Sequence, residues 1–577
     1  MKRILALLLL GLTVVGLLAS AQGQRNVAGS RGTRRAFTVV EASIPEMQAA
    51  LKQGQITSRE LVLQYLTRIA LYEDKLNAVM TVNRNALAEA EALDRERAQG
   101  RVRGPLHGIP IALKDNVQTT NMPTTGGALA FDGFVPPYEA TITKNLREAG
   151  AVILAKTTMT ELANWVAGAP TPMPGNYNAL AGYGMNPYDP RRDPREATGD
   201  GRPALSPVGS SSGIGTAANF WAANVGTETS GSILSPANAN MLAAIKPTVG
   251  RISRYGIIPI TADQDTAGPM AKTVTDAAIL LGAMESAAPD PNDPATNRCV
   301  PPPGRDYTRF LRTDGLQGAR IGIPRAFYYE AVTAPGVPGP VGGLNADQKG
   351  VMDEAIATLK QRGAVIVDPA DIPSVVSDDA QSNLLRWSIC SGAEDAKGKD
   401  EDCSTVLKYG MKRDFNQWLA TLGPGAPLKS LTELREFNMA HQAAGAIKYG
   451  QWELDNSDEM DVERDRARYE ADRAKDILLA ATNGIDAALS EHRLDALLFP
   501  ANRGANLAAR PGYPTVIVPF GMVPNAPTPP FPVGFNAKPA PFGVSFTGTA
   551  CSEPRLIELG YAFEQATKRR VPPPSAP

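Results

Sequence analysis

A lysine stands at the end of an apolar run in residues 104–117, which read GPLHGIPIALKDNV. Lysine side chains are strongly solvated and are seldom buried without a reason. Burial of Lys114 would disfavour its ammonium form and lower its pKa, which makes a lysine a usable general base. On this segment alone, the more ordinary interpretation is a strand-end lysine whose ammonium group reaches water.

Two segments rich in serine and glycine follow, SPVGSSSG at residues 206–213 and GTETSGSILSP at residues 226–236. Small residues permit tight turns and let a substrate approach the backbone closely. Backbone N–H groups in such turns can converge on an anion. Taken singly, each segment is more simply a loop without chemistry. The sequence predicts a helix over residues 216–225, so the two serine clusters would flank one element.

Together these segments resemble the amidase signature family. GPLHGIPIALKDN matches the family's lysine motif, and PVGSSSG followed by GTETSGSI matches its serine- and glycine-rich signature. KPTVGR at residues 246–251 and DTAGPM at residues 265–270 also fit. The resemblance is close over about residues 40–285, looser over 494–568 and faint from about 290 to 490. The resemblance is specific because three motifs occur in the same order as in the family.

The resemblance implies a Ser-Ser-Lys triad that hydrolyses a carboxamide. By motif position Lys114 is the base, Ser210 is the bridging serine, and Ser232 is the nucleophile that forms an acyl-enzyme. In the family the peptide bond before the bridging serine is cis, which is costly unless the surrounding turn enforces it. The implied reaction releases ammonia or an amine and uses no metal and no cofactor.

The resemblance also implies groups that support the triad. The backbone N–H groups of Thr229, Ser230 and Gly231 would hold the oxyanion, together with that of the nucleophile. Ser211 and Thr227 match family positions whose side chains hold the hydrogen-bond network together.

Four features depart from the family pattern. Val208 stands where a glycine is usual, Leu234 stands where many members have arginine, and Ser210 precedes Ser232 by about two residues fewer than usual. A stretch rich in proline and arginine, residues 186–205, is interpreted as an insertion. Because such changes near a strained site are costly, a weakly active or repurposed binding protein on the same fold is an alternative.

A second alternative is an esterase. Residues 209–213 (GSSSG) fit G-x-S-x-G, the nucleophile elbow of α/β-hydrolases, with Ser211 as nucleophile. His441 or His492 would complete a Ser-His-Asp triad, although the elbow should follow a strand and SPV is a poor one. The chain has only 3 histidines, which suits a hydrolase whose base is a lysine.

Apolar runs alternate with helical patterns, which predicts an α/β fold with a mixed central sheet covered by helices on both faces. Ser43 and Thr57 begin capping boxes, so a helix should follow each of them. Helices should also end at Gly150 and Gly363, and a charged helix is expected over residues 453–475. The predicted strands are residues 79–82, 109–113, 151–154, 319–323, 364–367, 496–499, 515–518 and 544–546.

The motifs span most of the 577 residues, so a single domain over about 40–570 is expected. Its variable region, about 290–490, should build the substrate side, and residues 571–577 (VPPPSAP) should be disordered. With 58 Lys+Arg against 59 Asp+Glu, the charge gives no reason to expect nucleic acid as a partner. The expected partner is a small-molecule or peptide amide, bound by a monomer or homodimer.

Residues 1–21 have the form of a secretory signal peptide. Lys2 and Arg3 precede an apolar run that ends in a small-x-small cleavage pattern, Ala19-Ser-Ala21. The run is too short to span a membrane, so we expect export to the periplasm or medium with no membrane attachment after cleavage. Export would place the 4 cysteines in an oxidising compartment, where Cys390 could pair with Cys403; four free thiols remain an equal alternative.

Overall fold

The computed structural model describes residues 37–168, 171–207, 213–391, 398 and 400–577. Residues 38–577 form one compact unit. No helix in these described ranges is long and apolar enough to cross a membrane.

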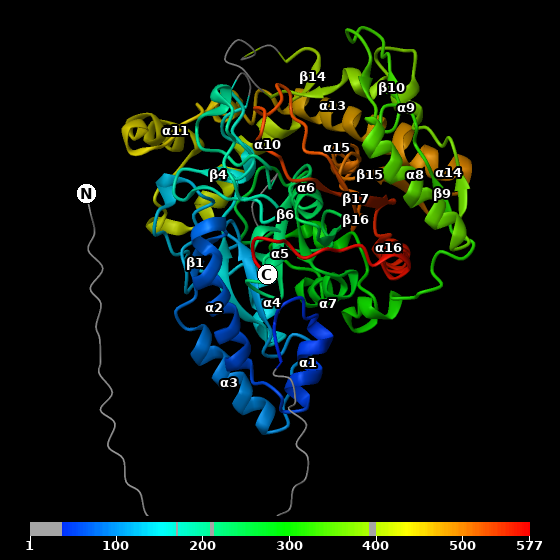
Figure 1. Cartoon of the computed structure of the whole chain (residues 1–577). Coiled ribbons are helices and arrows are strands. Elements are labelled where there is room, and N and C mark those ends of the chain that lie inside the picture. The colour runs from blue at the N-terminus through cyan, green and yellow to red at the C-terminus, as the bar shows by residue number, and fades with distance from the viewer. Residues whose placement is uncertain (1–36, 169–170, 208–212, 392–397, 399) are drawn as a thin grey trace, which may run out of the picture. The chain divides into compact units, whose positions relative to one another are not determined.

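A mixed sheet of 11 strands runs through the described part of this unit (Figure 1). Parallel pairs near its two edges, β3–β2–β6 and β15–β9–β12, flank a central antiparallel block. The α/β class predicted from the sequence is confirmed. In spatial order the strands are β1 (Val79–Val82), β3 (Val152–Thr157), β2 (Pro110–Lys114), β6 (Ala223–Glu228), β8 (Thr266–Ala271), β7 (Ala243–Lys246), β16 (Thr515–Val523), β17 (Ala540–Thr547), β15 (Ala496–Pro500), β9 (Arg320–Gly322) and β12 (Val365–Val367).

The central strand β16 carries an unbroken apolar run, residues 516–518, because both of its faces are covered there. On β16, Val516 and Val518 contact Gly560 of α16, whereas Ile517 packs on the opposite face with Ile233 and Leu234 beside α6. Helices α7 and α16 lie side by side on the α16 face. This arrangement explains the unbroken apolar run at residues 516–518 (VIV). Apolar and polar residues alternate along a strand only where one of its faces meets water, and neither face does here.

Sixteen α-helices surround the sheet within the described ranges. Both predicted capping boxes are present, Ser43 at α1 and Thr57 at α2, and α4 and α8 end just before Gly150 and Gly363. The helices are α1 (Ile44–Lys52), α2 (Ser58–Leu76), α3 (Ala86–Ala98), α4 (Thr141–Glu148), α5 (Gly213–Ala217), α6 (Leu234–Ala239), α7 (Val274–Met284), α8 (Ala346–Gln361), α9 (Pro373–Val376), α10 (Val406–Thr421), α11 (Leu431–Ala440), α12 (Trp452–Asp458), α13 (Arg466–Ile477), α14 (Asp486–His492), α15 (Ala505–Ala509) and α16 (Glu553–Thr567). Short two-stranded pairs join β4 (Tyr177–Asn178) to β5 (Gly182–Tyr183), β10 (Ala331–Val332) to β11 (Val341–Gly342), and β13 (Ser388–Ile389) to β14 (Cys403–Ser404).

All eight predicted strands are strands, but the helix predicted over residues 216–225 is wrong. Helix α5 stops at Ala217, and β6 begins at Ala223. Asn219 adopts a left-handed backbone conformation (φ 57°), which ends the helical path. The single helix predicted over residues 453–475 is also wrong, since α12 ends at Asp458 and α13 begins only at Arg466.

The proline- and arginine-rich stretch at residues 186–205 repeats the pattern Asp-x-Arg three times. In each repeat the carboxylate accepts both the backbone N–H and the guanidinium of the arginine two residues later. Two of these arginines then bind the proline-rich segment at residues 529–536. The repeats are Asp189–Arg191, Asp193–Arg195 and Asp200–Arg202.

The four cysteines form two disulfides, Cys299–Cys551 and Cys390–Cys403. The second is the pair that the sequence put forward. The chain end also differs from the prediction of disorder, because residues 571–577 return to α2 (Figure 1), where Arg68 donates to the carbonyls of Ala576 and Pro577 at 2.7 and 2.9 Å.

Candidate active site

The candidate site lies where the parallel strands β2 and β6 end side by side. Lys114 is the last residue of β2, and Thr227 and Glu228 are the last two of β6. Strand β8 runs the other way and pairs Thr266 with Glu228, so Asp265 arrives at the same edge. The sheet thus gathers three charged side chains from segments that are far apart in the sequence.

Lys114 is completely buried. Its Nζ donates to the hydroxyl of Thr227 at 2.8 Å and to the carbonyl oxygen of the same residue at 3.2 Å. Burial lowers the pKa of Lys114 to about 7, against the opposing effect of the carboxylates of Asp265 and Glu228. A large fraction of this lysine is therefore neutral at physiological pH and able to accept a proton.

Asn116 joins this network, although the sequence motifs gave it no role. Its Nδ2 donates to the Thr227 hydroxyl at 3.0 Å and to the carbonyl of Ile258 at 3.4 Å. Asn116 could have been identified from the sequence because it lies two residues after Lys114, inside the lysine motif.

The turn after β6 is tied down by a second carboxylate to which the sequence motifs gave no role. Asp265 accepts a hydrogen bond from the hydroxyl of Thr229, and its other oxygen accepts from the backbone N–H groups of Ile260 and Thr261 at 2.8 and 3.0 Å. Burial raises the pKa of Asp265 to about 7. This carboxyl fixes the first residue of the turn that carries Ser232.

Ser232 is half-buried in that turn, two residues before α6 begins. Gly231 before it has φ +94°, a conformation that favours glycine. Glu228 closes the turn, since its Oε2 accepts from the N–H groups of Ile233 and Leu234 at 2.8 and 2.9 Å. Leu234 is thus the first residue of α6 and is wholly buried.

The backbone donors of the turn are available to a ligand. Among the residues that the structure describes, no acceptor takes the N–H of Thr229, Ser230 or Gly231. The Ser230 hydroxyl is engaged elsewhere, with the side chain of Asn506. Three adjacent donors next to a serine hydroxyl are the arrangement that an oxyanion requires.

The remaining expected site residues lie outside the described ranges. These are Ser210, Ser211, Val208 and the peptide bond expected to be cis. The histidines of the esterase alternative are described: His441 is exposed at the end of α11 and His492 ends α14. Neither borders the two cavities around the site.

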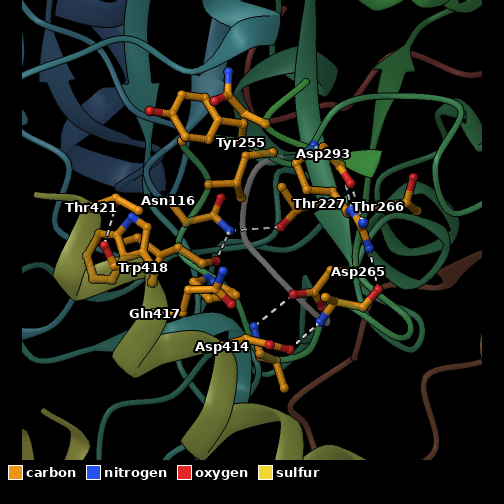
Figure 2. Close-up of a pocket in the computed structure, with 18 of the residues that line it drawn as sticks. Asn116, Thr227, Tyr255, Asp265, Thr266, Asp293, Asp414, Gln417, Trp418 and Thr421 are labelled. Atoms are coloured by element: carbon orange, nitrogen blue, oxygen red, sulfur yellow. Dashed lines mark hydrogen bonds and ion pairs between the residues drawn. The ribbon is translucent and has the colours of Figure 1, made fainter. Parts of the chain in front are cut away.

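Two cavities meet at Thr229. One, of about 410 Å³, is lined by Ser232 together with residues such as Trp165, Ile389 and Leu407. The other, of about 420 Å³, lies on the Lys114 side and is lined by Asn116 and Thr227 (Figure 2). Thr229, Ala163 and Ile260 border both. The region at 290–490 therefore supplies only part of the walls. The rest comes from residues between 116 and 175, from residues between 227 and 266, and from Asn506.

This chain and its fold are similar to proteins that are already known. The Amidase family matches residues 60–557. A probable amidase of Arabidopsis thaliana is 32% identical over 93% of this chain and 92% of its own length. A glutamyl-tRNA(Gln) amidotransferase subunit from Thermosynechococcus vestitus is 32% identical over 91% of this chain and 98% of its own.

Among solved structures, the native peptide amidase of Stenotrophomonas maltophilia superposes with a TM-score of 0.75 at 36% identity, covering 92% of this chain and 98% of that one. A buried lysine, a glycine-serine turn and this sheet define a C–N hydrolase of the amidase type. The chain belongs to the amidase signature family.

Proposed function

We propose that this amidase cleaves carboxamides through an acyl-enzyme on Ser232, with Ser210 as the bridging serine and Lys114 as the base. Neutral Lys114 takes a proton from Ser210, which takes one from Ser232 as its oxygen attacks the carbonyl. The relay then returns a proton to the leaving nitrogen, so that ammonia or an amine departs. Water repeats the attack on the ester and releases the acid.

The observation that carries this proposal is the state of Lys114. Lys114 is wholly buried, has a pKa of about 7, and is hydrogen-bonded to Thr227, where the turn that bears Ser232 begins. These properties suit a general base, whereas burying a lysine for a structural role alone would cost stability. The N–H groups of Thr229, Ser230 and Gly231 would stabilise the oxyanion, while Thr227 and Ser211 would support the relay.

We further propose a stand-alone, exported enzyme. The signal-like residues 1–21 and the two disulfides support export, since disulfides persist in oxidising compartments. Export and the absence of a cationic excess favour this over the role of an amidotransferase subunit. The N-terminal sequence of the protein recovered outside the cytoplasm tests this, with Gln22 as the expected first residue.

Amide hydrolysis is tested with a panel of primary and substituted amides, including C-terminally amidated peptides, by measuring released ammonia or amine. The parent should hydrolyse members of the panel, and Ser232→Ala should lose activity by several orders of magnitude while remaining folded. Ser235→Ala, three residues away in the same cavity wall, is the matched control and should stay active. Full activity of Ser232→Ala on every amide would refute the mechanism.

A further inference from the structure

The lysine that opens the motif at residues 246–251 (KPTVGR) has no part in the proposed relay, yet it is buried as deeply as Lys114. Lys246 is the last residue of β7 and is 0% exposed. Its Nζ donates to the backbone carbonyl of Tyr513 at 2.6 Å, and to no other acceptor among the described residues. Because an ammonium group has several N–H donors, this one bond leaves the buried cation in need of a negative charge nearby.

The strands bring Lys246 to the same edge of the sheet as Glu228. Strands β6 and β7 both run antiparallel to β8, which lies between them, so β6 and β7 end at the same edge. On β8, Gly268 pairs with Gly226 of β6 and, on its other side, approaches the β7 backbone on both sides of Lys246. The row of the sheet between Lys246 and β6 therefore holds two glycines, whose lack of side chains leaves the space above it open to Lys246 and Glu228.

Both side chains also lie on the α6 face of the sheet. Ala244, two residues before Lys246, packs with Ile233 and Leu234 on that face, and successive side chains of a strand alternate between faces. Glu228 reaches the same face, because its Oε2 accepts from the backbone N–H groups of Ile233 and Leu234. Lys246 and Glu228 thus share one face and one edge.

Glu228 has few groups that can balance its charge. It is 1% exposed, and its Oε1 has no hydrogen-bond donor in the described part of the chain. Lys114 and Lys246 both lie in its field, and since neither of these described side chains donates to it, they act on it through the low-dielectric interior.

The two lysines differ in how firmly they keep their proton. Burial lowers the pKa of Lys246 to about 8, and the carboxylate of Glu228 is the largest effect that opposes this fall. Glu553, the next carboxylate that acts on Lys246, is already paired with Arg251 at 2.8 Å. Because the pKa of Lys114 is about 7, Lys246 still holds its proton where Lys114 has lost half of its own.

We propose that Lys246 is a positioning residue, whose ammonium group keeps Glu228 ionised and so holds the turn that carries Ser232 while Lys114 is neutral. The inference rests on the proposed relay, in which Lys114 acts as a neutral base. An ionised carboxylate binds N–H groups more strongly than a neutral one. Loss of the Lys246 charge would therefore loosen the start of α6 and, with it, the oxyanion donors at residues 229–231.

The first test is Lys246→Met, which keeps a long apolar side chain and removes the charge. Ammonia release from an amide that the parent hydrolyses should show kcat about tenfold or more lower and KM nearly unchanged, because oxyanion donors act mainly on the transition state. Lys272→Met is the matched control. Lys272 is 2% exposed, burial lowers its pKa to about 8 as well, and it follows β8 at the opposite edge of the sheet, so kcat should be retained.

A second comparison separates charge balance from packing. Glu228→Gln keeps an acceptor oxygen for the two N–H groups, removes the charge, and should itself lower kcat. Adding Lys246→Met to Glu228→Gln should cost at most about twofold more, because the charge that Lys246 balances is already gone. This comparison remains decisive if Lys246→Met alone does not fold, since the double variant has no unbalanced carboxylate.

Unchanged kcat in Lys246→Met, or a loss confined to KM, would overturn the positioning role. A tenfold loss on adding Lys246→Met to Glu228→Gln would also overturn it, as would an equal loss of kcat in Lys272→Met. A parent that hydrolyses no amide of the panel, or a Ser232→Ala variant as active as the parent, would instead count against the proposed function.

Discussion

At the scale of single residues, the central property is the pKa of Lys114, which burial lowers to about 7. A base must be neutral, and the neutral fraction of a lysine grows as the pH rises through its pKa. We therefore expect kcat/KM to be low below pH 7 and to rise to a plateau above it. Lys114→Ala should be slow and should lose this acidic limb; a parent profile that is flat through this range would contradict the assignment.

Asp265 should set where that limb lies. Its carboxylate is the largest influence that favours the ammonium form of Lys114. Because burial raises the pKa of Asp265 itself to about 7, this charge is only partly present on the limb, and Asp265→Asn should move the limb to lower pH by less than about one unit. The plateau should also fall, because Thr229 loses a charged partner. Asp414→Asn, on the α10 side of the same cavity, is the matched control and should move the limb less, because Asp414 influences the pKa of Asp265 but is not among the groups that shift Lys114. Superimposable profiles of parent and Asp265→Asn would argue against this role.

At the scale of elements, the two disulfides should do different work. Cys390–Cys403 joins β13 to β14, and its neighbours Ile389 and Ser391 line the cavity of Ser232. Replacing both of these cysteines by serine should raise KM several-fold.

Cys299–Cys551 closes a separation of 252 residues and borders neither cavity. Its removal should lower the free energy of unfolding by about 2–5 kcal/mol and leave KM unchanged. Denaturant titration and steady-state kinetics on the two double variants separate these effects. An unchanged KM in Cys390→Ser/Cys403→Ser would show that the short bridge does not shape the cavity.

The helices and strands also show how much of the fold could be predicted from the sequence. Strands made of branched apolar residues, such as β16, and helices with capping boxes were predictable because their signal is local. Strands β6 and β8 read ANVGTE and TAGPMA, which lack that signal, and only pairing on both sides makes them strands.

Some residues of the candidate site could likewise be predicted from the sequence, and others could not. Lys114 and Ser232 were found through motifs, but the role of Asp265 depends on an antiparallel pairing that places it beside Glu228. Trp418 lies in a region without a recognisable motif, so its contact with the cavity follows only from the fold. Long-range neighbours of this kind leave no local pattern in the sequence.

At the scale of the whole molecule, the chain end is part of the compact unit. Arg68 is 7% exposed, and the carbonyls of Ala576 and Pro577 are among its few partners. Deleting these two residues should therefore lower the free energy of unfolding by about 1–3 kcal/mol. Tyr72→Phe, which removes only a long, exposed contact to Pro577, should have little effect. Equal stability of the truncated and full chains in urea would refute this.

The central claim is that Ser232 is the nucleophile of an acyl-transfer relay. Its most direct test is to react the full chain with a fluorophosphonate, follow the loss of amidase activity, and map the modified peptide by mass spectrometry. We predict a single adduct on Ser232, formed in step with inactivation and absent from Ser232→Ala. An adduct on Ser211, or full inactivation with Ser232 unmodified, would contradict the account.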